Sequence, residues 1–129
     1  MRCLRPVHEL AICQALIGQV AEVARERQAV AVTDIYVSVG PLSGVEGTLM
    51  QSAFPLAAAG TVANEATLHL QATAIRISCE ECGEESEAIM NRLLCEHCGH
   101  WRTRVISGDE LMLQRVVLDG TGAGGQVHV

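Results

Sequence analysis

Apolar residues recur at spacings of three and four between His8 and about Arg27. This periodicity places them on one face of an α-helix, so the segment is predicted to be an amphipathic helix. The apolar stripe consists of Leu10, Cys13, Leu16, Ile17, Val20, Val23 and Ala24.

The pattern changes to strict alternation between Ala31 and Val39, which predicts a half-buried strand. Gly40-Pro41 ends this strand, and a second helix is expected after Ser43. Ser43 and Glu46 have the spacing of a capping box, in which a hydroxyl and a carboxylate satisfy the first free N–H groups of a helix. Gly60 is a natural end for that helix.

Residues 65–78 are predicted to form a second strand whose alternation shifts by one residue near Ala74. Such a shift is typical of a bulge, here where the strand leaves the main sheet. Further strands are expected at residues 101–107 and 111–118. The glycine-rich residues 119–129 are expected to be a disordered tail. The fold class predicted is α+β: a small three-stranded sheet with two helices, plus a metal-binding module.

Four cysteines define that module. Cys79 and Cys82 form one CxxC pair, and Cys95 and Cys98 form a second pair twelve residues later. Each tight turn can direct two sulfurs at one ion, and two such turns complete a tetrahedral S4 set, which suits zinc. Iron could occupy the same ligands, but the spacing favours a zinc ribbon. Because all four positions are protein ligands, the ion is predicted to be structural.

Charge and composition exclude several functions. The 129 residues carry a formal net charge of −6, and all nine positive residues are arginine. This acidity, with six glutamates around the cysteines, disfavours a nucleic-acid partner. No segment suits a membrane span, and paired CxxC motifs without a convincing signal peptide favour the cytoplasm. No phosphate loop and no nucleophile with a base is found, so the protein is predicted not to be an enzyme.

Several motifs together resemble one family. The helix begins His8-Glu9-Leu10, the first strand runs into Val-Gly-Pro-Leu-Ser-Gly-Val-Glu at residues 39–46, and Gly-Asp-Glu-Leu at residues 108–111 follows the cysteine module. From His8 to about Leu118, this arrangement resembles the HypA/HybF hydrogenase maturation proteins. Paired cysteines occur in many families, whereas the combination of all these motifs is far more specific.

The resemblance implies a metallochaperone that delivers Ni(II) during maturation of [NiFe]-hydrogenase. It implies structural zinc on the four cysteines and nickel on His8, with adjacent backbone nitrogens as co-ligands and Glu9 as a further candidate ligand. Nickel(II) favours such nitrogen donors in square-planar or tetragonal sites. The implied partners are a HypB-type GTPase and the hydrogenase large subunit, with the urease system as another client. The alternative hypothesis is a zinc-ribbon protein-binding adaptor without nickel transfer.

The chain departs from the family at its start. In the family the nickel-binding histidine follows the initiator methionine, whereas His8 follows Val7 and six earlier residues. Residues 1–7 are therefore interpreted as a doubtful extension, with the product expected to begin at position 7. The predicted domains are 8–76 with 108–118 for nickel binding, and 77–107 for the zinc ribbon. Cys13 is expected in the core, His69 on the surface, and Trp101 against the base of the ribbon.

Overall fold

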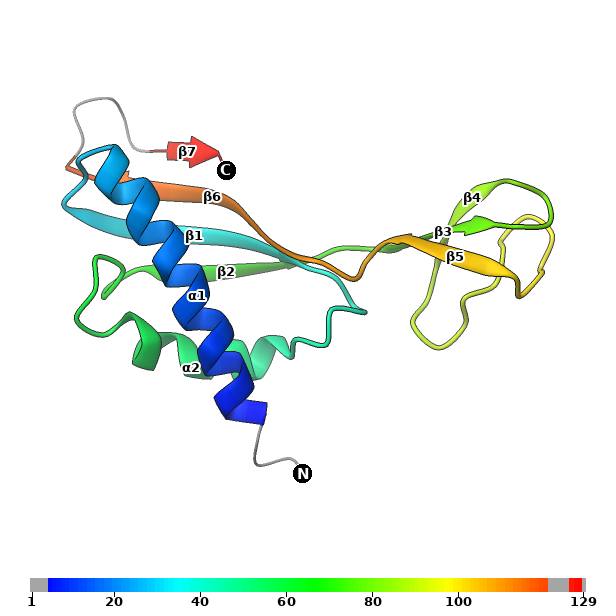
Figure 1. Cartoon of the computed structure of the whole chain (residues 1–129), viewed down its shortest axis with the longest axis horizontal. Coiled ribbons are helices and arrows are strands. Elements are labelled where there is room, and N and C mark those ends of the chain that lie inside the picture. The colour runs from blue at the N-terminus through cyan, green and yellow to red at the C-terminus, as the bar shows by residue number, and fades with distance from the viewer. Residues whose placement is uncertain (1–4, 121–125, 129) are drawn as a thin grey trace. The chain divides into compact units, whose positions relative to one another are not determined.

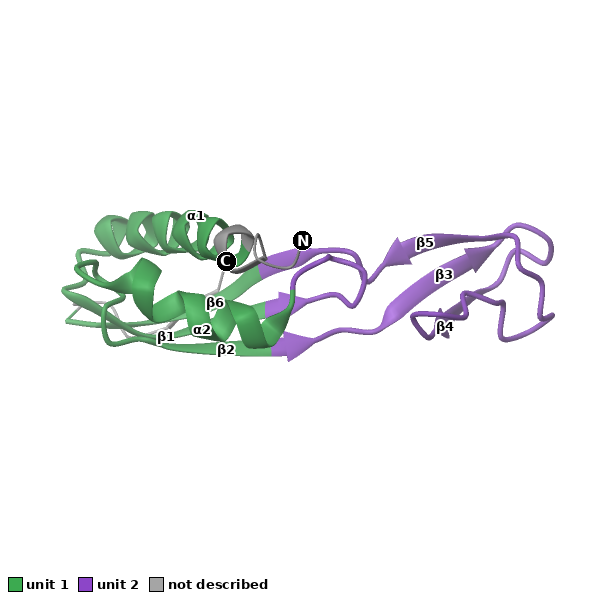
Figure 2. Cartoon of the chain, turned by 90° about the horizontal axis from the view of Figure 1, so that it is seen from below, with its two compact units in different colours: residues 1–37, 46–70, 113–129 green, residues 38–45, 71–112 purple. Residues whose placement is uncertain are grey.

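A computed structural model of the protein describes residues 5–120 and 126–128, with side chains described for residues 9–120. The chain divides into two compact units (Figure 2). We call residues 1–37, 46–70 and 113–129 the helical unit, and residues 38–45 and 71–112 the ribbon unit. The fold class is α+β, as predicted.

Two helices lie against one sheet in the helical unit (Figure 1). Helix α1 spans Arg5–Glu26, and α2 spans Gly47–Ala58 and packs against it. The strands follow the order β2-β1-β6-β7. Their bounds are Ala31–Val39 for β1, Thr67–Ala72 for β2, Leu111–Asp119 for β6 and Gln126–His128 for β7.

The core of the helical unit is aliphatic. Five residues of the predicted helix stripe, Cys13, Leu16, Ile17, Val20 and Ala24, are buried. From the sheet, Ile35 and Val37 of β1 and Val116 of β6 are also almost fully buried. Burying such side chains stabilises a fold by about 1.5–3 kcal/mol each, so this unit has its own hydrophobic core.

The ribbon unit contains a three-stranded antiparallel sheet in the order β4-β3-β5. Strand β3 spans Ile75–Cys79, β4 spans Glu85–Ala88 and β5 spans Thr103–Ser107. The pairing of β3 with β5 contains a register irregularity between Arg76 and Ile77. The central strand, β3, ends at Cys79, the first of the four candidate metal ligands.

Some predicted boundaries were wrong. The single strand expected at residues 65–78 is two strands, β2 and β3, in different sheets, and they separate where the alternation shifts. Helix α1 begins at Arg5, three residues before the apolar pattern starts. In the segment expected to be disordered, residues 126–128 instead form β7, which pairs with β6 and adds a fourth strand to the predicted three. Residues 121–125 and 129 of that segment lie outside the described residues.

Two of the family motifs meet inside the ribbon unit. The N–H of Gly40 donates to the carbonyl of Glu110 at 2.8 Å, and the N–H of Leu42 donates to the carbonyl of Gly108 at 2.7 Å. A Cβ atom on Gly40 would lie 2.2 Å from the Gly108 carbonyl oxygen. Only glycine permits backbones to approach this closely, which gives the Val-Gly-Pro and Gly-Asp-Glu-Leu motifs a physical reason.

Candidate metal centre

The two CxxC pairs form turns with the same backbone hydrogen bonds. The N–H of Gly83 donates to the Cys79 carbonyl at 3.0 Å, and the N–H of Gly99 donates to the Cys95 carbonyl at 2.8 Å. Gly83 and Gly99 have φ values of 78° and 77°, a region that side chains other than glycine disfavour. Each turn thereby brings its two cysteines to one side.

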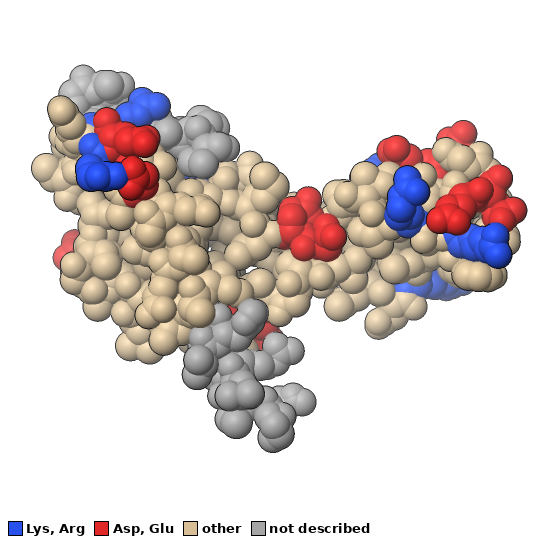
Figure 3. Space-filling model, viewed as in Figure 1, with Lys and Arg blue, Asp and Glu red and all other residues tan. Residues whose placement is uncertain are grey.

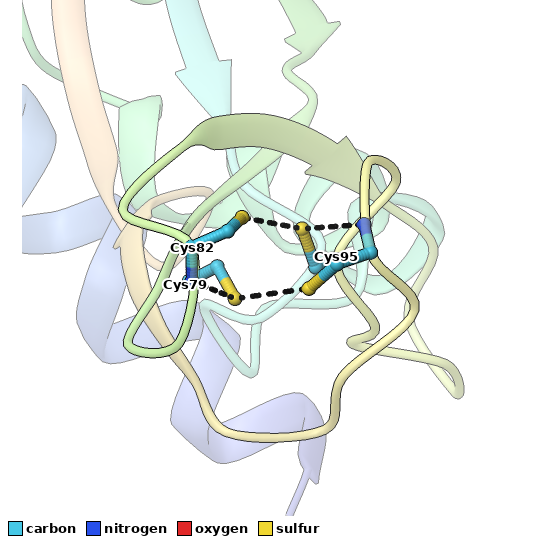
Figure 4. A group of neighbouring side chains, drawn as sticks. Cys79, Cys82 and Cys95 are labelled. Atoms are coloured by element: carbon cyan, nitrogen blue, oxygen red, sulfur yellow. Dashed lines mark hydrogen bonds between the residues drawn. The ribbon is translucent and has the colours of Figure 1, made fainter.

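All four sulfurs converge (Figure 4). The ligand atoms of Cys79, Cys82, Cys95 and Cys98 lie within 4.8 Å of one another. The Sγ atoms of Cys79 and Cys98 are 3.6 Å apart, and those of Cys82 and Cys95 are also 3.6 Å apart. A tetrahedral ion with Zn–S bonds of about 2.3 Å places its sulfurs about 3.8 Å apart. The donor set and its spacing therefore fit zinc, and they leave no ligand position open.

Backbone N–H groups point at the first sulfur of each pair. Glu81 and Cys82 donate to Cys79 Sγ at 3.4 and 3.5 Å, and His97 and Cys98 donate to Cys95 Sγ at 3.4 Å each. Hydrogen bonds from Cys98 and then His97 lower the pKa of Cys95 to about 6, although burial opposes the shift. At Cys95 the turn thus favours the thiolate, the form that binds metal. Burial and neighbouring thiols instead raise the pKa of Cys82 to about 12 and also raise that of Cys98.

The surface around this cluster is acidic. Charged side chains gather on the ribbon unit, with acidic ones prominent among them (Figure 3). In the described part of the unit, two arginines form ion pairs: the half-buried Arg76 with Glu85 at 3.7 Å, and the exposed Arg102 with Glu81 at 3.9 Å. The exposed glutamates are Glu80, Glu81, Glu84, Glu85, Glu87 and Glu96.

The prediction for Trp101 was wrong. Its side chain is 68% exposed instead of packing the base of the ribbon. The ring stacks on His100 with centroids 5.7 Å apart, and the Arg102 guanidinium lies 5.5 Å from the ring centroid. The two residues that flank Trp101 in sequence thus contact its ring, and apolar patterning does not reveal such contacts.

The second candidate site lies at the start of α1. His8 is within this helix, but its side chain lies outside the described residues. Glu9 is fully buried, with an exposed fraction of 0%. Its Oε2 accepts a hydrogen bond from the Glu46 N–H at 3.0 Å, and in the described part of the chain its Oε1 is buried without a hydrogen-bond partner.

The hydrogen bond from the Glu46 N–H to Glu9 takes the place of the predicted capping box. Helix α2 begins at Gly47, and Glu46 precedes it in an extended conformation with no side-chain cap of its own. The Ser43 hydroxyl accepts from the Val45 N–H at 3.3 Å, so it closes a local turn outside the helix. The carboxylate at the start of α2 therefore comes from α1, a long-range contact that no local sequence pattern could reveal.

Cys13, one turn after Glu9, behaves as the core residue that was predicted. It is fully buried, and its thiol donates to the Met50 carbonyl at 3.5 Å. Burial, with a smaller contribution from Glu9, raises the pKa of the thiol to about 11. The thiol therefore stays protonated near neutral pH, which makes it a poor metal ligand.

A polar cluster on the sheet was missed by the sequence analysis. His69 stacks on Tyr36, with centroids 4.3 Å apart and planes 8° apart, and the Arg115 guanidinium lies 3.9 Å from the Tyr36 centroid. His69 Nε2 donates to Asp34 Oδ1 at 2.8 Å, which lowers the pKa of that carboxyl. Because β2, β1 and β6 are neighbours, these side chains form a cross-strand ladder. The alternation that places Asp34 and Tyr36 on the same face of β1 is visible in the sequence, but the order of the strands in the sheet is not.

The fold and the four-sulfur cluster define a metal-binding α+β protein with a zinc-ribbon-type module. In the described part of the chain, no helix is long and apolar enough to cross a membrane. Residues 7–118 match the family model described as "Hydrogenase/urease nickel incorporation, metallochaperone, hypA". The chain belongs to this HypA family of nickel metallochaperones, which acts in hydrogenase maturation.

Curated relatives agree with this assignment. The chain is 44% identical over 112 residues to the hydrogenase maturation factor HypA of Nitrosospira multiformis, covering 87% of this chain and 97% of the relative. It is 40% identical to HypA of Aquifex aeolicus, covering 88% and 98%. The solution structure of the Ni metallochaperone HypA from Helicobacter pylori is 22% identical, with a TM-score of 0.66 over 87% of this chain and 97% of that one. At that identity, the structural match supports the fold.

Proposed function

We propose that this chain carries Ni(II) at His8 and delivers it to the large subunit of [NiFe]-hydrogenase, while Cys79, Cys82, Cys95 and Cys98 hold a structural zinc ion. The observation that carries the proposal is the family match over residues 7–118, which includes every one of these residues. The convergence of four sulfurs supports the zinc assignment independently.

The two metals have different tasks because their sites differ chemically. A closed set of four cysteines retains its ion and stabilises the fold around it. A histidine with backbone nitrogens is a peripheral site that suits Ni(II) and can release it to a recipient. We assign nickel binding to residues 8–76 and 108–118, and zinc binding to residues 77–107.

Delivery requires partners. We propose a HypB-type GTPase as the partner that supplies nucleotide hydrolysis, and the cytoplasm as the location. The chain itself acts as a carrier and not as an enzyme. The urease system is the alternative client, since the description of the family model names both hydrogenase and urease.

A nickel titration of the zinc-loaded protein tests this proposal. Two forms would be compared, the 129-residue chain and a chain that begins at position 7 with methionine. We expect one nickel ion per chain in the second form, lost in His8→Ala with zinc content and circular dichroism unchanged. The matched control is His69→Ala, which removes a histidine from the helical unit without affecting nickel.

Activity in cells provides the second measurement. At limiting nickel, His8→Ala should abolish hydrogenase activity, and added nickel should partly restore it. Unchanged hydrogenase activity in this variant, together with no specific nickel binding in either form, would contradict the proposal. The zinc-ribbon adaptor would then be the better hypothesis.

A further inference from the structure

The buried carboxylate of Glu9 points to a role distinct from nickel ligation. We propose that Glu9 is a positioning residue: by accepting the Glu46 N–H, it holds the start of α1 against the start of α2 and so fixes the backbone that presents His8. This inference rests on the proposed nickel site at His8. Glu9 then positions the nickel site and does not contact the metal.

Helix α2 needs this carboxylate. The first N–H groups of a helix have no partner within the helix, and a negative charge there also interacts favourably with the helix dipole. Glu46, the residue before α2, provides no side-chain cap, and α2 has no acidic residue in its first turn. Glu9 is the acceptor for the Glu46 N–H, at 3.0 Å.

The burial of Glu9 argues against direct ligation. A transferable metal needs ligands that a recipient can displace, and such ligands are accessible. Glu9 is 0% exposed, whereas the neighbouring Leu10 is half-buried and Ala11 is exposed. Oε1 has no hydrogen-bond partner in the described part of the chain, and both carboxylate oxygens are buried, since the whole residue is 0% exposed. The carboxylate is thus directed into the protein, where its bonded oxygen joins the two helices.

The effect on nickel passes through the main chain. His8 and Glu9 share a peptide bond, and both lie in the first turns of α1. Fixing the Glu9 side chain therefore restricts the orientation of the His8 backbone, whose nitrogen is one of the expected nickel donors. Preorganised ligands bind more tightly than ligands that must first be ordered.

Two conservative substitutions give opposite results under the two roles. Glu9→Gln keeps an oxygen at the same reach, so it can still accept the Glu46 N–H. Glu9→Asp keeps the carboxylate but is one methylene shorter, so it cannot reach. We expect Glu9→Gln to bind nickel within about threefold of the wild type, and Glu9→Asp to bind about tenfold or more weakly, the usual size of losing a charged hydrogen bond. A direct ligand would produce the reverse order.

A change on the other partner tests the same contact without altering Glu9. Glu46→Pro removes the N–H donor. Because the Glu46 side chain is exposed, Glu46→Gln serves as a control that keeps this N–H. Glu46→Pro should weaken nickel binding as much as Glu9→Asp does, and Glu46→Gln should have no effect. The nickel absorption bands of Glu9→Gln should match those of the wild type, because the ligand set is the same.

The measurements separate this inference from the proposed function. Each variant would be titrated with Ni(II) as the zinc-loaded protein, in the form that binds nickel, with its fold checked by circular dichroism. Loss of nickel in Glu9→Gln with retention in Glu9→Asp, or wild-type binding by Glu46→Pro, would overturn the positioning role. Absence of nickel binding in the wild type would instead refute the nickel site itself.

Discussion

The two units of this chain are stabilised by different means. Of the buried apolar side chains described, only Ile75, Ile77, Cys79 and Cys95 lie in the ribbon unit, and two of these are candidate metal ligands. All the others belong to the helical unit, where two helices cover an aliphatic sheet. A short segment with so small a core requires another source of stability, and a tetrahedral metal ion on the four cysteines would supply it.

This difference suggests how one chain could keep one metal ion permanently and transfer another, as the proposed function requires. In the proposed function, the ribbon unit needs the zinc ion on its four cysteines in order to fold, so that ion must not leave. The helical unit has its own hydrophobic core, so the nickel ion proposed to bind at the start of α1 would be able to leave without unfolding this unit. Three predictions test this contrast, beginning with the largest effect.

Removal of the ribbon metal should unfold one unit and spare the other. We expect a strong chelator, or Cys95→Ser, to collapse the amide NMR dispersion of residues 75–107 while leaving that of α1 and α2 unchanged. The reason is that the two buried isoleucines of the ribbon unit cannot hold three strands without the metal. Cys13→Ser, which changes a buried cysteine outside the cluster, is the control and should leave the metal content intact.

Gly40→Ala should destabilise the ribbon unit by about 3 kcal/mol, because the added Cβ would clash with a backbone carbonyl that cannot move freely. The measurement is chemical denaturation monitored by circular dichroism in the metal-loaded protein. Gly18→Ala is the matched control: a Cβ there meets nothing within 4 Å, and alanine favours the helix. Equal stability of the two variants would show that the Gly40–Gly108 approach is not a tight constraint.

The smallest expected effect concerns acid. The hydrogen bond from His69, with a smaller one from Thr33, holds the pKa of Asp34 below its ordinary value. A folded-state pKa below the unfolded one of about 3.9 adds stability above that pH, and the gain disappears as pH falls through the folded value. We expect Asp34→Asn to lose less than about 1 kcal/mol at pH 7, because the pair is partly exposed. The difference from wild type should disappear as the pH falls through the folded-state pKa of Asp34, as measured by thermal unfolding of the helical unit.

Regular periodicity carried most of the fold prediction. The bounds of β1 were predicted correctly, and the stripe on α1 is the buried face of that helix. The CxxC spacing was enough to predict the cluster, since two-residue turns impose their geometry locally. These features depend on neighbours in sequence, which a pattern can represent.

The missed features depend on residues far apart in the chain. Glu9 meets Glu46 across 37 positions, and the ladder of His69, Tyr36 and Arg115 requires the strand order. Strand β4 has the sequence ESEA, with no apolar alternation, and forms because the first cysteine turn directs it back onto β3. Each of these features depends on a tertiary contact that the local sequence pattern either does not indicate or contradicts.

The exposed tryptophan gives the protein a natural optical label. Trp101 is the only indole and lies in the ribbon unit, whereas Tyr36, the only phenol, lies in the helical unit. Since the indole is already hydrated in the folded chain, its emission colour should change little on unfolding, but its fluorescence anisotropy should fall as the second cysteine turn loosens. Excitation at the long-wavelength edge of the indole band, where the phenol absorbs little, would therefore follow the ribbon unit alone, without any dye or engineered residue.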